Sequence, residues 1–212
     1  MYKSVFMFSF FSLVAFSAES QTSLLSTGVE VNHKSHNGEL HRLTIKRDID
    51  PECKKIHISN DVFWKDKYAS DKVSEKCKST FITSAGKVIF PMKLHRDVDT
   101  YGELEVMTFI KEMQKNGSML FIDTRDEEWY GYRTIPGAEN MHYVYMTMPK
   151  VFEEEYKASL VKLGIVRNNN SFDFSKAKTL LLFCNGAWCS QSPKMVNALV
   201  TMGYPPEKIK WY

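Results

Sequence analysis

The sequence has little of the charge imbalance that would point to a polyanionic partner. Lys and Arg total 28 against 25 Asp and Glu, which leaves a formal net charge of +3. The basic residues form no stripe with interleaved aromatic residues, so the sequence predicts no nucleic-acid partner. With 43% apolar and 25% charged residues, the chain also falls outside the composition of disordered proteins. Its 212 residues are enough for one core domain and a smaller extension.

Long hydrophobic runs are absent from the sequence beyond its N-terminal segment. Lys3 precedes an apolar run at residues 5–14 (VFMFSFFSLV), and small residues follow at positions 15, 17, 18 and 20. This order predicts a cleaved secretory signal over residues 1–20 and a periplasmic or otherwise exported protein. The alternative is an uncleaved anchor, although the run is shorter than the ~20 residues of a spanning helix. We expect no stable membrane span after signal cleavage.

Cysteine is scarce, with four residues in the whole chain. Cys53 and Cys77 lie in the N-terminal half, whereas Cys184 and Cys189 lie near the C-terminus. Disulfides persist in exported proteins, and pairing within each half is the simplest arrangement, so we expect a Cys53–Cys77 disulfide. Four cysteines nevertheless allow three connectivities, and the spacing does not choose among them.

The histidines suggest a metal site, but their spacing does not support one. They occur neither at i, i+4 on a helix nor within a tight Cys/His cluster. We therefore interpret them as solvated surface residues and expect no metal and no cofactor. The residues concerned are His33, His36, His41, His57 and His95.

Two regions differ in pattern. Residues 21–99 are polar and lysine-rich, with short apolar runs at 43–45, 81–83 and 88–90 that predict a small β-rich extension. From Thr100 onward the patterns are stronger, because Thr100 and Glu103 form a capping box for a helix that Gly117 ends. Its apolar face consists of Leu104, Met107, Ile110 and Met113.

Strands and helices alternate after this first helix, which predicts an α/β fold with a parallel sheet flanked by helices. The ligand edge of such a sheet is formed by the carboxyl ends of its strands. Asp123 and Cys184 each follow a buried strand, so both are expected at this edge. The expected strands are 119–122 and 179–183, the expected helices 126–132, 151–163 and 194–202, with a turn at 135–138 and a loop at 168–170.

The segment from Cys184 to Ser190 joins a buried strand to a helix. Backbone N–H groups in such a loop can form a concave anion-binding nest, and the N-terminus of the helix adds positive potential. Both effects lower the pKa of a thiol and favour the reactive thiolate. Cys184 is therefore the candidate nucleophile.

Three motifs in this order resemble the rhodanese family over residues 100–212: Asp123-Thr124-Arg125, Ile135-Pro136-Gly137-Ala138 with Asn140 following, and the loop from Cys184 to Cys189. The resemblance implies a sulfurtransferase in which Cys184 carries sulfane sulfur as a persulfide, taking it from a small donor and passing it to a thiol or cyanide. The anion-binding loop would comprise Asn185, Gly186, Ala187, Trp188 and Cys189. Asp123 would brace the loop, and Arg125 would lie near the rim of the site, with a salt bridge to Glu128 as its expected structural role.

Some features depart from the family pattern. The loop lacks the basic residues with which many members attract thiosulfate, so thiosulfate is a doubtful donor. Trp188 could contact a substrate or pack over the loop. Cys189 could attack a Cys184 persulfide or close a disulfide with Cys184. In the alternative reading, the disulfide makes the domain a noncatalytic binding or redox-sensing module.

The ends of the domain raise two further expectations. Family domains usually continue into a closing helix, whereas this chain stops at Tyr212, so the C-terminal end is possibly truncated. A sheet without that helix would expose apolar surface on one side and favour a partner. A third functional hypothesis assigns the activity to residues 21–99, which would dock to another exported protein.

Overall fold

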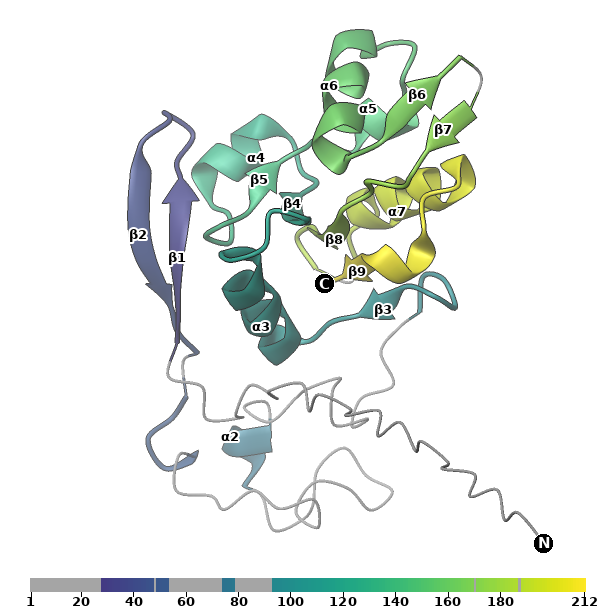
Figure 1. Ribbon diagram of the computed structural model, residues 1–212. Coiled ribbons are helices and arrows are strands. Elements are labelled where there is room, and N and C mark those ends of the chain that lie inside the picture. Colours follow the sequence, from purple (N-terminus) through teal and green to yellow (C-terminus); the bar gives the residue numbers. More distant parts are fainter. Residues whose placement is uncertain (1–27, 48, 54–73, 79–92, 170, 187) are drawn as a thin grey trace, which may run out of the picture.

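The computed structural model describes residues 28–47, 49–53, 74–78, 93–169, 171–186 and 188–212 (Figure 1). Its centre is a parallel five-stranded sheet with the strand order β3-β9-β8-β4-β5. The predicted α/β architecture is therefore confirmed. The strands are β3 (Asp99–Thr100), β4 (Met119–Asp123), β5 (Glu139–Asn140), β8 (Thr179–Phe183) and β9 (Ile209–Trp211).

The two central strands, β4 and β8, are buried on both faces, and their alternate side chains enter different cores. Leu120 and Ile122 share one core with Leu180 and Leu182, whereas Phe121 shares the other with Leu181 and Phe183. This period of two is the expected consequence of strand geometry. The first core is completed by α5 (Val144–Thr147), α6 (Glu153–Leu163) and α7 (Gln191–Met202), and the second by α3 (Glu103–Met113).

The start of α3 differs from the sequence prediction. Its N-cap is Gly102, whose backbone N–H donates to Glu105 Oε2 at 2.9 Å. Thr100 does not cap the helix because it belongs to β3 and pairs with Trp211 of β9. The apolar face predicted for the helix is confirmed, since Leu104, Met107 and Ile110 are buried and Met113 is partly buried. The predicted end at Gly117 is wrong, because the helix ends at Met113 with Gln114 as its C-cap.

An antiparallel hairpin of β1 (Val29–Lys34) and β2 (Leu40–Ile45) stands beside α3 (Figure 1). Val29 and Val31 are buried in the same core as Phe121 and Leu181. The expectation of an uncovered apolar sheet face is thus wrong, because this hairpin and α3 together cover it. The strand predicted at 43–45 lies within β2, whereas the signal at 1–20 and the strands at 81–83 and 88–90 lie outside the described residues.

Smaller elements complete the described parts. A hairpin is formed by β6 (Val166–Asn168) and β7 (Ser171–Asp173). Of the loop expected at 168–170, Asn168 ends β6 and Asn169 follows it, whereas Asn170 lies outside the described residues. The predicted disulfide between Cys53 and Cys77 is present, with Cys77 in the short α2 (Glu75–Lys78). The short helix η3 (Pro206–Lys208) precedes β9. Within the ranges described, no helix has the length and apolar character needed to cross a membrane.

Candidate functional site

The predicted site residues meet at the carboxyl edge of the sheet. Asp123 ends β4 and Cys184 follows β8, and the two strands are direct neighbours with Asp123 opposite Phe183. The connection continues beyond the strands, because the Thr124 N–H and hydroxyl both donate to the Phe183 carbonyl, at 3.1 and 2.8 Å. The Asp123-Thr124-Arg125 motif therefore bonds directly to the last residue of β8, which precedes Cys184.

A buried ion pair of Asp123 and Arg125 supports this edge. Arg125 Nη2 lies 2.6 Å from Asp123 Oδ2, and Arg125 Nε donates to Oδ1 at 2.9 Å. The side chains are 0% exposed for Asp123 and 8% for Arg125. The predicted salt bridge from Arg125 to Glu128 is wrong, because Arg125 pairs with Asp123 instead. Arg125 precedes Asp126, the N-cap of α4 (Glu127–Tyr132), and so does not share a helix with Glu128. The Arg125 backbone N–H also donates to Asp123 Oδ1, at 3.1 Å, so the bend after β4 brings Arg125 back to this carboxylate.

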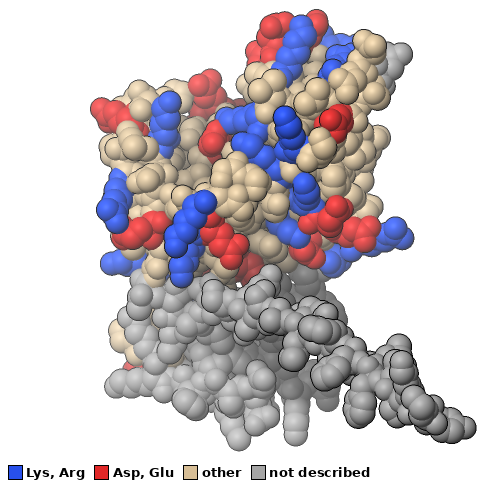
Figure 2. Space-filling model, viewed as in Figure 1, with Lys and Arg blue, Asp and Glu red and all other residues tan. Residues whose placement is uncertain are grey.

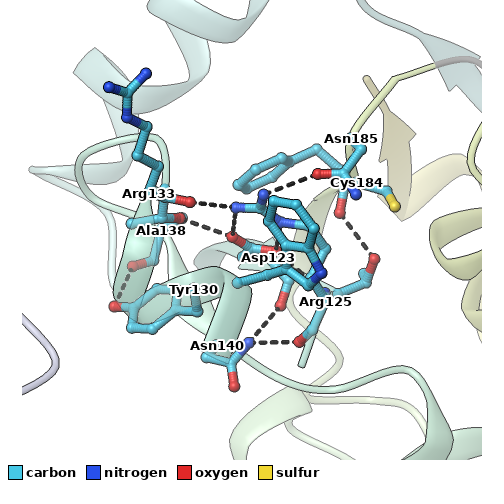
Figure 3. Close-up of polar contacts among 12 residues, drawn as sticks. Asp123, Arg125, Tyr130, Arg133, Ala138, Asn140, Cys184 and Asn185 are labelled. Atoms are coloured by element: carbon cyan, nitrogen blue, oxygen red, sulfur yellow. Dashed lines mark hydrogen bonds and ion pairs between the residues drawn. The ribbon is translucent and has the colours of Figure 1, made fainter. Parts of the chain in front are cut away.

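Arg125 extends this ion pair to the cysteine loop. Its Nη1 donates to Asn185 Oδ1 at 2.9 Å, and its Nη2 also donates to the Arg133 carbonyl. Figure 3 shows Asp123 and Arg125 between the Arg133–Asn140 side of the site and the Cys184–Asn185 turn. The guanidinium thus fixes the residue directly after the candidate nucleophile, which agrees with a place at the site rim.

Asn140 and Thr134 satisfy the remaining polar groups of the pair. Thr134 Oγ1 donates to Asp123 Oδ2 at 2.8 Å. Asn140 Nδ2 donates to the carbonyls of Asp123 and Arg125, at 3.2 and 2.7 Å (Figure 3). A buried charge is tolerated when its hydrogen-bonding capacity is filled in this way, so the network is a rigid support.

Aromatic side chains flank the guanidinium. Arg125 Cζ lies 6.0 Å from the ring centroid of Trp129 and 5.9 Å from that of Phe183. Nearby, the Tyr130 hydroxyl lies 3.1 Å from the Ala138 carbonyl, to which it can donate (Figure 3). Burial, and then the charges of Glu139 and Asp123, raise the pKa of Tyr130 above its usual value of 10.0. Tyr130 is therefore a protonated hydrogen-bond donor at neutral pH.

Cys184 is 8% exposed and forms a disulfide with Cys189 in this structure. Both sulfurs lie near the side chain of Gln191, the first residue of α7. Gln191 Oε1 is 3.5 Å from Cys184 Sγ and 4.0 Å from Cys189 Sγ. Gln191 could not be singled out from the sequence, since a polar residue at a helix start resembles an ordinary first-turn residue.

The loop between the two cysteines contains an internal backbone hydrogen bond and a highly exposed side chain, that of Trp188. The Cys189 N–H donates to the Gly186 carbonyl at 2.9 Å, so in this disulfide form that amide is not available to the expected anion nest. Trp188 is 84% exposed, and its ring lies over Gly186, where an added Cβ would come within 2.6 Å of it. Both suggested roles for Trp188 are thus compatible with its place, while Ala187 lies outside the described residues.

The histidines that the structure describes lie in different strands and loops. No group of three or more His, Cys, Asp or Glu residues suited to a metal ion occurs within the described ranges. His33 differs from the solvated role expected for it: it is half-buried, and its Nδ1 accepts the Gly137 N–H at 3.3 Å. His57 lies outside the described residues. On the face shown in Figure 2, acidic and basic side chains of the described part alternate without one sign dominating.

Comparison with known proteins identifies a family whose model covers the candidate site. The family model for the rhodanese-like domain matches residues 107–212. This range contains all three motifs and the whole network around Arg125. Searches of curated proteins and of solved structures gave no match. On the strength of the family model, the chain belongs to the rhodanese-like domain family.

Proposed function

We propose that this protein is a sulfur carrier in which Cys184 takes a sulfane sulfur as a persulfide and passes it to a thiol acceptor. The observation that carries the proposal is the position of Cys184, at the carboxyl end of buried β8 and 3.5 Å from the first side chain of α7. The positive end of a helix lowers the pKa of a nearby thiol and stabilises an anionic persulfide. A rigid strand end with this potential suits two-step nucleophilic catalysis.

The charge distribution favours an uncharged or organic sulfane donor over thiosulfate. Asn185, Gly186 and Trp188 are uncharged, and Arg125 already serves Asp123, Asn185 and the Arg133 carbonyl. A guanidinium engaged in this way has few donors left for an anionic donor. Thiosulfate would therefore have to compete with a buried ion pair.

A noncatalytic redox-sensing or binding module is the second candidate, and the Cys184–Cys189 disulfide is the observation that favours it. As long as this bond is closed, Cys184 has no thiolate to offer. Reduction by a thiol would have to precede any sulfur loading. The two candidates differ in what the reduced protein does with a donor.

We extend the proposal to an exported location. Two disulfides lie within the described ranges, Cys53–Cys77 and Cys184–Cys189, and disulfides are typical of oxidising compartments. A donor, an acceptor and any exported partner would then be encountered outside the cytoplasm. N-terminal sequencing of protein secreted by an expressing host tests the signal, with removal of residues 1–20 as the expected result.

The test of the sulfur carrier is peptide mass mapping after mild reduction and exposure to an organic sulfane donor, cysteine persulfide. Because Cys189 can close a disulfide with Cys184, the loading is measured on Cys189→Ser. We expect one added sulfur on the Cys184 peptide of Cys189→Ser and none on that peptide of Cys184→Ser. Cys189, which remains as a thiol in Cys184→Ser, serves as the internal control for nonspecific sulfur addition. A reduced protein with free Cys184 that takes up no sulfur would contradict the proposal and favour the redox module.

A further inference from the structure

We infer that Cys189 is the resolving thiol of a reductive cycle, in which the Cys184 persulfide is released as hydrogen sulfide and an external dithiol reopens the resulting disulfide. This inference rests on the proposed sulfur-carrier function and assigns it a product and a second substrate. The protein would then act as a dithiol-dependent sulfane reductase.

The first support is the reach of Cys189. The structure holds Cys184 Sγ and Cys189 Sγ in a disulfide across a four-residue loop, with both sulfurs beside Gln191 Oε1. A thiol that can bond Cys184 Sγ directly can also attack that atom when it carries a further sulfur. The Gln191 oxygen can accept a hydrogen bond from either thiol in the reduced state, which keeps the two groups together.

The chemistry of the release step balances without any other reactant. The Cys189 thiolate attacks Cys184 Sγ, the Sγ–Sγ bond forms, and the bond from Cys184 Sγ to the outer sulfur breaks. The outer sulfur leaves with the electron pair as hydrosulfide. It has been reduced by two electrons, and the two cysteine thiols have been oxidised to the disulfide seen in the structure.

The second support is the unequal exposure of the two sulfurs. Cys184 is buried at 8% exposure, whereas Cys189 is partly exposed and follows the highly exposed Trp188. An external thiolate therefore reaches Cys189 Sγ first. Cleavage there expels Cys184 as the thiolate, at the start of α7 where a negative charge is best stabilised, and a stabilised thiolate is the better leaving group.

The same geometry selects a dithiol as reductant. Attack by a monothiol leaves a mixed disulfide on Cys189, which the neighbouring Cys184 thiolate can attack to close the loop again. A second thiol on the reductant competes with this closure because it too acts within one molecule. It attacks the reductant's own sulfur in the mixed disulfide, frees Cys189 as a thiolate, and leaves the reductant as its cyclic disulfide.

The experiment compares full-length wild type with Cys189→Ser, each reduced, freed of reductant and loaded with cysteine persulfide, which leaves cysteine when it gives up its outer sulfur. After removal of the donor, we expect the wild type to release one sulfide per chain and close its disulfide. Cys189→Ser should retain one sulfur on Cys184. A wild type that keeps its persulfide beside a free Cys189 would overturn the inference and leave the sulfur carrier intact. Failure of both proteins to load would instead contradict the sulfur carrier.

The choice of reductant is tested on the oxidised wild type. At equal thiol concentration, we expect dithiothreitol to restore loading at least tenfold more effectively than 2-mercaptoethanol. Rapid alkylation during 2-mercaptoethanol treatment should give the mercaptoethanol adduct on Cys189 and the alkyl group on Cys184. Equal restoration by both reagents, or an adduct on Cys184, would contradict the proposed order of attack.

Discussion

At the scale of single residues, the position of the Arg125 side chain is fixed by its hydrogen-bond partners. Its guanidinium is held by two contacts to the Asp123 carboxylate and one each to Asn185 and the Arg133 carbonyl. This fixed fork of donors is a geometry that a lysine ammonium cannot reproduce. The residue therefore matters for both the stability of the edge and the position of the loop.

Replacing Arg125 by Ala is expected to lower the free energy of unfolding by about 3–5 kcal/mol, because Asp123 is left as a buried, unpaired charge. Urea unfolding measures the change. Arg96→Ala is the matched control, since its ion pair with Asp97 is at the surface and Arg96 is 88% exposed. Removal of such an exposed pair is expected to cost less than ~1 kcal/mol. Equal losses in the two variants would contradict a supporting role for the buried pair.

Gly137 in the Ile-Pro-Gly-Ala turn is a second sensitive residue. Its φ of +89° lies in the left-handed region, and an added Cβ would lie 2.6 Å from Val31 Cγ2. Gly137→Ala is expected to destabilise the protein by ~1–3 kcal/mol through backbone strain, with further loss from the clash. Thermal or urea unfolding tests this against Gly117→Ala, where an added Cβ meets nothing within 4 Å. A Gly117→Ala variant as unstable as Gly137→Ala would point to a general cost of alanine instead.

At the scale of elements, the hairpin of β1 and β2 is attached to this same turn. Val31 packs against Gly137, and His33 Nδ1 accepts the Gly137 N–H. The Tyr130 hydroxyl lies between two carbonyls, 3.3 Å from that of Lys34 and 3.1 Å from that of Ala138. The hairpin therefore contacts the segment that also supports Arg125.

This attachment is expected to weaken in acid. Burial, followed by the charge of His41, lowers the pKa of His33 below the ordinary value of 6.5. The unfolded chain then binds the proton more readily, so the free energy of unfolding falls as the pH drops below 6.5. Protonated Nδ1 also can no longer accept the Gly137 N–H.

Urea unfolding at about pH 7 and about pH 5 measures this loss across the range in which histidine titrates. In His33→Asn, a neutral oxygen can accept in place of Nδ1, so this variant is expected to lose less stability than the wild type. The same loss in both proteins would assign the pH dependence to other groups.

The elements of the sheet and its helices could be predicted because their patterns are local. Apolar runs such as residues 179–183 and a helical face such as Leu104, Met107 and Ile110 report burial directly. The first strand of the hairpin was missed because only Val29 and Val31 mark it. Asn37-Gly38 was the available turn signal, and Gly38 adopts a φ of +90° there.

The site could be predicted in its residues more than in its contacts. Cys184, Asp123 and Arg125 follow from motifs at strand ends, whereas the partner of Arg125 depends on where α4 begins. Glu128 was the expected partner, but Asp126 caps the helix and leaves Arg125 outside it. Gln191 and the coverage of the sheet by the hairpin depend on tertiary packing, which no local pattern encodes.

At the scale of the whole molecule, two disulfides close loops of different length. Cys53 and Cys77 are 24 residues apart and both fully buried, whereas Cys184 and Cys189 are 5 residues apart. A longer closed loop removes more conformational freedom from the unfolded chain. The first disulfide should therefore contribute more to stability, and the second more to chemistry.

Replacing both Cys53 and Cys77 by Ala is expected to lower the free energy of unfolding by about 3.5 kcal/mol, from chain entropy. Replacing both Cys184 and Cys189 by Ala is expected to cost about 2 kcal/mol on the same basis. Urea unfolding without reductant compares the two double variants. The reverse order would show that strain or packing around the sulfurs outweighs loop length.

The hairpin of β1 and β2 lies outside the family match but belongs to the hydrophobic core. The family match begins at Met107, inside α3, yet Val29 and Val31 complete the core beneath Phe121 and Leu181. The chain thus has two boundaries: the first is the start of the family match, and the second is the start of the part of the chain that packs in the core. A fragment of residues 107–212 would keep the three motifs but lose Val29 and Val31 from the core, so we expect it to be less stable than the whole chain.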